Sequence, residues 1–255
     1  MFLEHTSKLM SNTKFLVLYI QAVLNQTYCK RLILRWVLFL NKILCFPQKA
    51  FFLTFTTADI RLQNLHSLTT KDWQLLARET NHPDGTLSVF NYQNRIIRDS
   101  LYYIKNKKDA QITRSMCQIL VDILLEELSE REVLNNFTSP LLVSIPSTKD
   151  HIYKRGYNPS EVITKEISGL TLIPYIPNII LKSRHTPAQK TLSRYERLKN
   201  VKNSMSINTR HQDKIKNRCV IVIDDIMTTG ATLKEAKRVL LKAGARKIMG
   251  VVLAH

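Results

Sequence analysis

Two adjacent carboxylates, Asp224 and Asp225, follow an unbroken β-branched run at residues 220–223, which is the pattern of a strand buried on both faces. Residues 228–232 then read Thr-Thr-Gly-Ala-Thr and lead into a stretch with helical spacing of apolar residues. Backbone N–H groups of such a loop, with the positive end of the helix dipole, suit a phosphate. Carboxylates accept hydrogen bonds from vicinal sugar hydroxyls, so the arrangement predicts a site for a phosphorylated sugar. A threonine-rich turn is the plain alternative, but it leaves unexplained two acids at the end of a buried strand, where an unpaired carboxylate is costly.

The segment 223–232, Ile-Asp-Asp-Ile-Met-Thr-Thr-Gly-Ala-Thr, resembles the phosphoribosyl-pyrophosphate (PRPP) motif of type I phosphoribosyltransferases. The resemblance implies that Asp224 and Asp225 hold the ribose 2′ and 3′ hydroxyls, directly or through Mg²⁺. It also implies that the 5′-phosphate is wrapped by the loop Thr228, Thr229, Gly230, Ala231 and Thr232. In such enzymes a nucleophile displaces pyrophosphate from the anomeric carbon, and pyrophosphate leaves as its magnesium complex.

Three further blocks resemble the ComF family of competence-associated, phosphoribosyltransferase-like proteins. They are a strand closed by Pro146 and followed by Arg-Gly-Tyr-Asn at 155–158, the segment 181–200, and the segment 91–105. The resemblance covers roughly residues 86–255 and implies a role in DNA uptake. By position it implies a pyrophosphate loop at Ser147, Thr148, Lys149 and Arg155, and a mobile loop that carries Arg184, Arg194 and Arg197. For each arginine, a solvated basic surface is the alternative. Tyr157 and Asn158 either shape the pocket or pack against and cap the following helix.

The chain also departs from this family's pattern. The family often opens with a zinc ribbon, but the four cysteines, Cys29, Cys45, Cys117 and Cys219, form no Cys-x-x-Cys pair. We therefore expect no zinc site. Pro159 stands where the family usually has Gln, and proline is well tolerated in a first helical turn.

A net charge of +18 over 255 residues indicates anionic partners. Two hypotheses follow. In the first, the protein is a phosphoribosyltransferase that transfers phosphoribosyl to an unknown acceptor and releases pyrophosphate. In the second, it is a non-catalytic module that senses PRPP and binds single-stranded DNA and a competence helicase. Exposed aromatic side chains among basic residues would favour binding of single strands.

Residues 1–50 are apolar but carry seven basic residues against one acidic residue. Neither of their apolar stretches reaches the ~20 uninterrupted apolar residues that span a bilayer. We expect a helical extension, either a hairpin packed on the main domain or basic helices on a membrane surface; a later start, for instance at Met10, is a third reading. The expected compartment is the cytoplasm, with peripheral contact to the inner face of the membrane in the second reading.

The pattern predicts an α/β fold, in which a mostly parallel sheet is flanked by helices. Residues 51–85 are read as a connector with a short helix near 70–78, and residues 86–255 as the phosphoribosyltransferase-like domain. Within that domain we expect strands at 87–92, 140–145, 178–182, 219–224 and 247–253, and helices at 95–105, 110–128, 159–168 and 232–243. Ligands of such sheets bind beyond the carboxyl ends of the strands, where the 224–225 turn and the 146–149 loop would both open.

Overall fold

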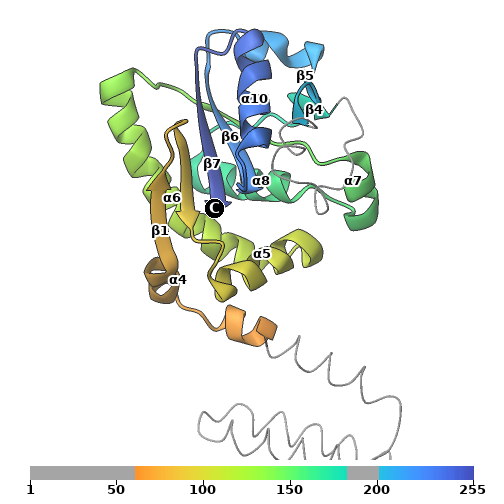
Figure 1. The fold of residues 1–255 in the computed structure, drawn as a ribbon. Coiled ribbons are helices and arrows are strands. Elements are labelled where there is room, and N and C mark those ends of the chain that lie inside the picture. The colour runs from red at the N-terminus through yellow and green to blue at the C-terminus, as the bar shows by residue number, and fades with distance from the viewer. Residues whose placement is uncertain (1–60, 183–200) are drawn as a thin grey trace, which may run out of the picture. The chain divides into compact units, whose positions relative to one another are not determined.

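The computed structural model describes residues 61–182 and 201–255. Residues Leu62–His255 form one compact unit built on a five-stranded sheet of order β1-β2-β7-β6-β3 (Figure 1). Strands β2, β7, β6 and β3 are parallel, and β1 lies antiparallel to β2 at one edge. The predicted mostly parallel α/β sheet is therefore confirmed. The strands are β1 Ala77–Asn81, β2 Thr86–Phe90, β3 Leu141–Ser144, β6 Cys219–Ile226 and β7 Lys247–Ala254.

Helices cover both faces of this sheet (Figure 1). One face packs against α5, α6 and α8, and the other against α10 and a small two-stranded sheet of β4 and β5. The helices are α4 Thr70–Leu76, α5 Arg95–Lys107, α6 Ala110–Asn135, α7 Lys149–Arg155, α8 Pro159–Thr171, α10 Ala231–Lys242 and the 3₁₀ helix η2 Thr209–Lys214. The small strands are β4 Ile180–Lys182 and β5 Met205–Ile207.

The β-branched run that precedes the acidic pair lies in β6, an interior strand of the sheet, as its composition predicts. Val220 and Val222 pack into the core on the α10 face, whereas Ile221 and Ile223 pack into the core on the α6–α8 face. All four side chains are fully buried. Side chains alternate between the two faces of a strand, so only a strand covered on both sides uses an unbroken apolar run.

Three segments differ from the sequence-based expectation. Residues 62–85, read as a connector from residue 51 onward, belong to the same compact unit as the rest. Trp73 is buried there and packs edge-on against Phe90, with 6.2 Å between the ring centroids. The edge strand β1 reads Ala-Arg-Glu-Thr-Asn and is largely exposed, so no apolar alternation marks it. The segment read as a basic loop after Pro146 contains helix α7.

Helix α6 continues to Asn135, beyond the predicted end at residue 128. Its last two turns expose Val133 and Leu134 and carry the i,i+4 ion pair between Glu127 and Arg131. The apolar periodicity fades there because this part of the helix has no core face, while side-chain pairs on the helix surface still support it.

Several predictions fall on residues that the structure does not describe. They are the helical extension at 1–50 with its membrane contact, Cys29 and Cys45, and the three arginines of the predicted mobile loop, Arg184, Arg194 and Arg197. Within residues 61–182 and 201–255, no helix has the length and apolar character needed to cross a bilayer.

Candidate functional site

A pocket of about 260 Å³ opens at the carboxyl end of β6. The acidic pair and the loop Thr228–Thr232 line it together, so the structure gathers the residues of the predicted ribose and 5′-phosphate sites in one place. The pocket is also lined by Tyr92 and Lys105, from the first half of the domain, and by Val201. The pocket therefore lies where open parallel sheets bind their ligands.

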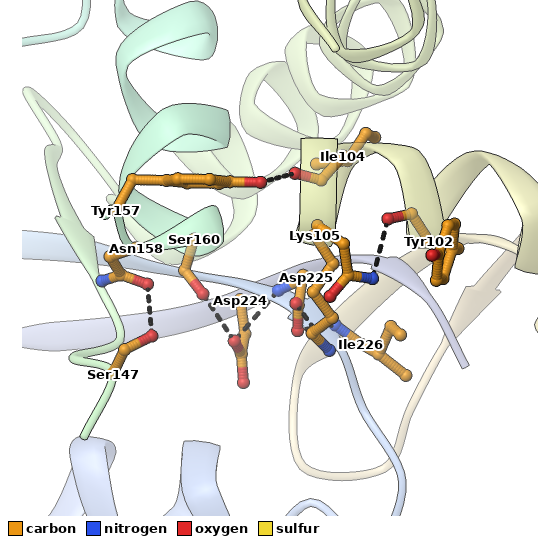
Figure 2. Close-up of polar contacts among 11 residues, drawn as sticks. Tyr102, Ile104, Lys105, Ser147, Tyr157, Asn158, Ser160, Asp224, Asp225 and Ile226 are labelled. Carbon is orange, nitrogen blue, oxygen red and sulfur yellow. Dashed lines mark hydrogen bonds and ion pairs between the residues drawn. The ribbon is translucent and has the colours of Figure 1, made fainter. Parts of the chain in front are cut away.

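Asp224 accepts hydrogen bonds from described residues at one of its two carboxylate oxygens. Its Oδ1 accepts a hydrogen bond from Ser160 Oγ at 2.8 Å and one from the backbone N–H of Asp225 at 3.0 Å (Figure 2). No described residue donates a hydrogen bond to Oδ2. Burial, and next the charge of Asp225, raise the pKa of Asp224 to about 7, while Ser160 and Lys105 act against this rise.

This raised pKa predicts a pH dependence of stability. Between the ordinary value of 3.8 and about 7, the folded state holds a proton that the unfolded state has lost, so the free energy of unfolding falls as pH rises through that window. We expect Asp224→Asn to remove a fall on the order of 2 kcal/mol between about pH 5 and pH 7.5. Urea unfolding of both proteins across this range measures it. Parallel curves for the two proteins would contradict the prediction.

Asp225 is paired with a lysine from a distant helix. Lys105 Nζ, near the end of α5, lies 2.8 Å from Asp225 Oδ2, and the backbone N–H of Ile226 donates to Oδ1 at 2.8 Å. Only 12% of the Asp225 side chain is exposed, against 31% for Lys105. The sequence placed Lys105 within a family-like segment but gave it no role, because nothing local links it to residue 225.

Tyr157 fixes the end of the helix that carries this lysine. Its hydroxyl donates to the carbonyl of Ile104 at 2.9 Å (Figure 2). The same hydroxyl accepts from the backbone N–H of Lys108 at 2.8 Å. Of the two readings given to Tyr157, capping is therefore the one observed, but the helix that it caps is α5 and not the following helix α8. Tyr157 positions Lys105 and does not line the pocket.

Removal of the Lys105 charge should destabilise the fold through the acidic pair. In Lys105→Gln, a largely buried carboxylate loses its cation beside a second carboxylate, so we expect a loss of about 1–3 kcal/mol in the free energy of unfolding at neutral pH. Urea unfolding measures this loss. Lys107→Gln, on the same helix but exposed and without an ion pair to the described residues, is the matched control and should change stability by less than about 0.5 kcal/mol.

The loop after the acidic pair presents unused backbone donors to the pocket. Gly230 adopts a left-handed conformation with φ +70° and is the N-cap residue of α10. No side chain makes a capping hydrogen bond there. Ala231 N–H makes only a long contact, 3.4 Å, with Thr229 Oγ1. The first amides of a helix have no partner within the helix, so this turn suits an anion such as phosphate.

The loop after β3 begins at the same edge of the sheet, because the backbone N–H of Ile145 donates to the carbonyl of Ile223. Ser147 Oγ donates to Asn158 Oδ1 at 2.8 Å (Figure 2). Asn158 Nδ2 donates to the carbonyl of Ile145 at 2.8 Å. Asn158 thus ties the start of α8 to this loop. Thr148 caps α7 by accepting from His151 N–H.

Of the four predicted pyrophosphate-loop residues, two use their side chains in local structure. Ser147 and Thr148 use their hydroxyls within the loop and the helix cap, and Lys149 and Arg155 are the first and last residues of α7. None of the four lines the described part of the pocket.

The acidic pair has the chemistry that Mg²⁺ prefers. Mg²⁺ is usually held by one or two carboxylates and completes its shell with water and substrate phosphate oxygens. Asp224 and Asp225 supply two carboxylates, and Oδ2 of Asp224 accepts from no described residue. Within the described ranges no three His, Cys, Asp or Glu side chains form a metal-binding group, so the pair fits Mg²⁺ only together with a phosphate ligand.

The chain is similar to several known proteins. Residues 178–255 match the model of the phosphoribosyl transferase domain. Competence protein F of Haemophilus influenzae is 32% identical over 107 residues, which are 42% of this chain and 46% of that protein. Competence protein ComFC of Streptococcus pneumoniae is 26% identical over 166 residues, 63% of this chain and 64% of that protein.

These matches support a ComF-family protein with a phosphoribosyltransferase-like domain. The family resemblance predicted from the sequence is thereby confirmed. DNA utilization protein YhgH of Escherichia coli K12 is a further ComF-like relative, 26% identical over 148 residues, 58% of this chain and 62% of that protein. The chain thus spans between about half and two thirds of the length of these curated relatives.

Proposed function

We propose that the pocket at the end of β6 binds PRPP with Mg²⁺. The observation that carries the proposal is that one pocket holds both the acidic pair and the left-handed turn into α10. Asp224 Oδ2 accepts no hydrogen bond from a described residue, and no side chain caps the helix at that turn. The turn has donors for the 5′-phosphate and the carboxylates have acceptors for the ribose hydroxyls. A threonine-rich structural turn would have no use for either set.

We further propose that the protein transfers phosphoribosyl to an acceptor. The bond from the anomeric carbon to pyrophosphate breaks, pyrophosphate takes the electron pair, and the acceptor nucleophile bonds to that carbon and loses a proton. Asp224 and Asp225 would hold Mg²⁺, which would supply positive charge to offset the charge of the leaving pyrophosphate. Thr228–Thr232 would anchor the 5′-phosphate, and Lys105, which lines the pocket, would place a positive charge beside the ligand.

Two more groups of residues belong to this proposal. Lys182, at the end of β4, lies close enough to Asp224 for the two charges to interact, although burial lowers the pKa of Lys182. It is a second cation for pyrophosphate. The Ser147–Arg155 loop and Arg184, Arg194 and Arg197 remain proposed pyrophosphate ligands, in which case the loop would have to change its hydrogen bonds when the ligand enters.

Transfer is tested by measuring pyrophosphate released from PRPP and Mg²⁺ in the presence of a panel of nitrogen nucleophiles, including free nucleobases. We expect release above the uncatalysed rate with one class of acceptor, and none from the Asp224→Asn/Asp225→Asn variant. Saturable PRPP binding with no release for any acceptor would instead support the second candidate.

In that second candidate the protein senses PRPP without transferring it and works with DNA. It is favoured by the names of the relatives, which concern competence and DNA utilization, and by the net charge of +18. Single-stranded DNA, a competence helicase and, through residues 1–50, the inner face of the membrane are its proposed partners.

A further inference from the structure

The C-terminal end of α5 and the short helix α7 together form a basic surface beside the pocket. Its cations lie in two short segments, 105–108 and 149–155, whose single acidic residue is Asp150. We call this the α5–α7 surface and define it by Lys105, Lys107, Lys108, Lys149, Lys154 and Arg155. Lys107, Lys108, Lys149 and Lys154 are exposed, and apart from Lys105 none of the six forms an ion pair with the described residues.

Two observations place the two segments side by side. Tyr157, two residues after α7, makes both of its hydroxyl hydrogen bonds to the end of α5, and Lys108 Nζ lies 5.7 Å from the centre of the Tyr157 ring. The imidazole of His151 on α7 also lies within the electrostatic reach of both segments. Burial lowers the pKa of His151, and Arg155, Lys182, Lys105 and Lys154 lower it further.

Exposed aromatic rings lie among these cations. Tyr153, beside Lys154 on α7, is 92% exposed, and Tyr102, one helical turn before Lys105 on α5, is 54% exposed. Tyr92, 38% exposed, lines the neighbouring pocket. In the part of the chain that the structure describes, these three are the exposed large aromatic residues. A tyrosine ring that is this exposed is available to stack on a ligand.

The opposite end of the parallel strands, where β6 and β7 begin, is also basic, but its cations contact the protein itself. There Arg246 donates to the carbonyl of Asn136, Lys247 to that of Asn135 and Arg218 to that of Ser139, so these cations hold the end of α6 and the loop after it. No exposed aromatic residue accompanies them within the described ranges. These cations therefore bind the protein's own carbonyls, whereas the cations of the α5–α7 surface, apart from Lys105, form no ion pair with the described residues.

We propose that the α5–α7 surface binds single-stranded nucleic acid. Cations along a surface follow the phosphates of a strand, and exposed rings stack on its unpaired bases, which a duplex does not offer. This gives the DNA-binding part of the second candidate a defined surface. It does not rest on PRPP chemistry, although Lys105 belongs to both the surface and the pocket wall.

Fluorescence anisotropy of the full chain with a labelled poly-thymidine strand tests the proposal. We expect Tyr153→Ala to weaken binding about tenfold and Tyr153→Phe, which keeps the ring, to bind like the parent. Lys149→Gln with Lys154→Gln should reduce the slope of log affinity against log salt by about one to two. Lys214→Gln with Lys216→Gln, the same charge change on exposed residues near the start of β6, is the matched control and should leave the slope unchanged.

Three results would overturn the proposal. They are parent-like binding by Tyr153→Ala and the Lys149/Lys154 variant, an equal loss in the Lys214/Lys216 control, and equal affinity for a duplex of the same length. The Asp224→Asn/Asp225→Asn variant separates this surface from the PRPP pocket. It should keep strand binding even though PRPP binding is lost, because its changes remove no cation and no exposed ring.

Discussion

Replacement of Asp224 and Asp225 together by asparagine is expected to lower the affinity for PRPP and Mg²⁺ at least about 100-fold. Hydrogen bonds to a charged acceptor contribute about 1.5–3 kcal/mol each, and two such acceptors are lost along with the metal ligands. The backbone N–H of Asp225 and Ser160 Oγ can both donate to an amide oxygen in place of the carboxylate of Asp224. The local structure should therefore persist.

Ligand-induced thermal stabilisation measures this effect, because a ligand that binds only the folded state raises its melting temperature. We expect a PRPP-dependent rise for the parent and none for the variant. Asp122→Asn with Glu126→Gln, a matched loss of two charges on the exposed side of α6, should keep the parent's rise. A variant that still responds to PRPP like the parent would show that the acidic pair does not hold the ligand.

Gly230→Val is expected to weaken PRPP binding by altering the turn into α10. Gly230 has φ +70°, a conformation that costs a β-branched residue roughly 1–3 kcal/mol. The nearest atom to an added Cβ would be Met227 Sδ at 3.6 Å, an ordinary contact, so backbone strain and not a clash drives the change. A relaxed turn would no longer point its amides at one phosphate. We expect at least about a tenfold loss of affinity.

Gly85→Val provides the matched control for backbone strain. Gly85 has φ +76° in the turn before β2, and it does not line the described pocket. Both variants should lose a similar amount of thermal stability, since both place valine in the left-handed region. Only Gly230→Val should weaken PRPP binding. Equal binding losses in the two variants would mean that general destabilisation, and not the phosphate turn, is responsible.

The sequence predicts most of the sheet well because strands such as β6 and β3 are short, buried apolar runs bounded by clear turn residues. Residues 219–224 and 140–145 needed no further context to be read as buried strands. It misses β1 because an exposed edge strand of polar residues carries no hydrophobic alternation. It misses α7 because basic and aromatic residues on a largely exposed helix leave no apolar stripe.

The candidate site likewise has a part that the sequence predicts and a part that it misses. Asp224, Asp225 and the 228–232 loop are contiguous, so one segment of sequence is enough to place them together. The ion pair of Lys105 with Asp225 and the hydrogen bond of Ser160 with Asp224 join residues far apart in the chain. Such pairings depend on how α5 and α8 pack against β6, which local patterns do not encode. The raised pKa of Asp224 is likewise a product of burial and of this packing.

Calorimetric titration of the full chain with PRPP, in the presence and absence of Mg²⁺, tests the central claim most directly. The account predicts saturable binding at one site per chain, much weaker when Mg²⁺ is chelated, and stronger as pH rises toward about 7 and Asp224 loses its proton. The absence of saturable heat from a protein that unfolds cooperatively would contradict the PRPP pocket and leave the motif as a structural element of the fold.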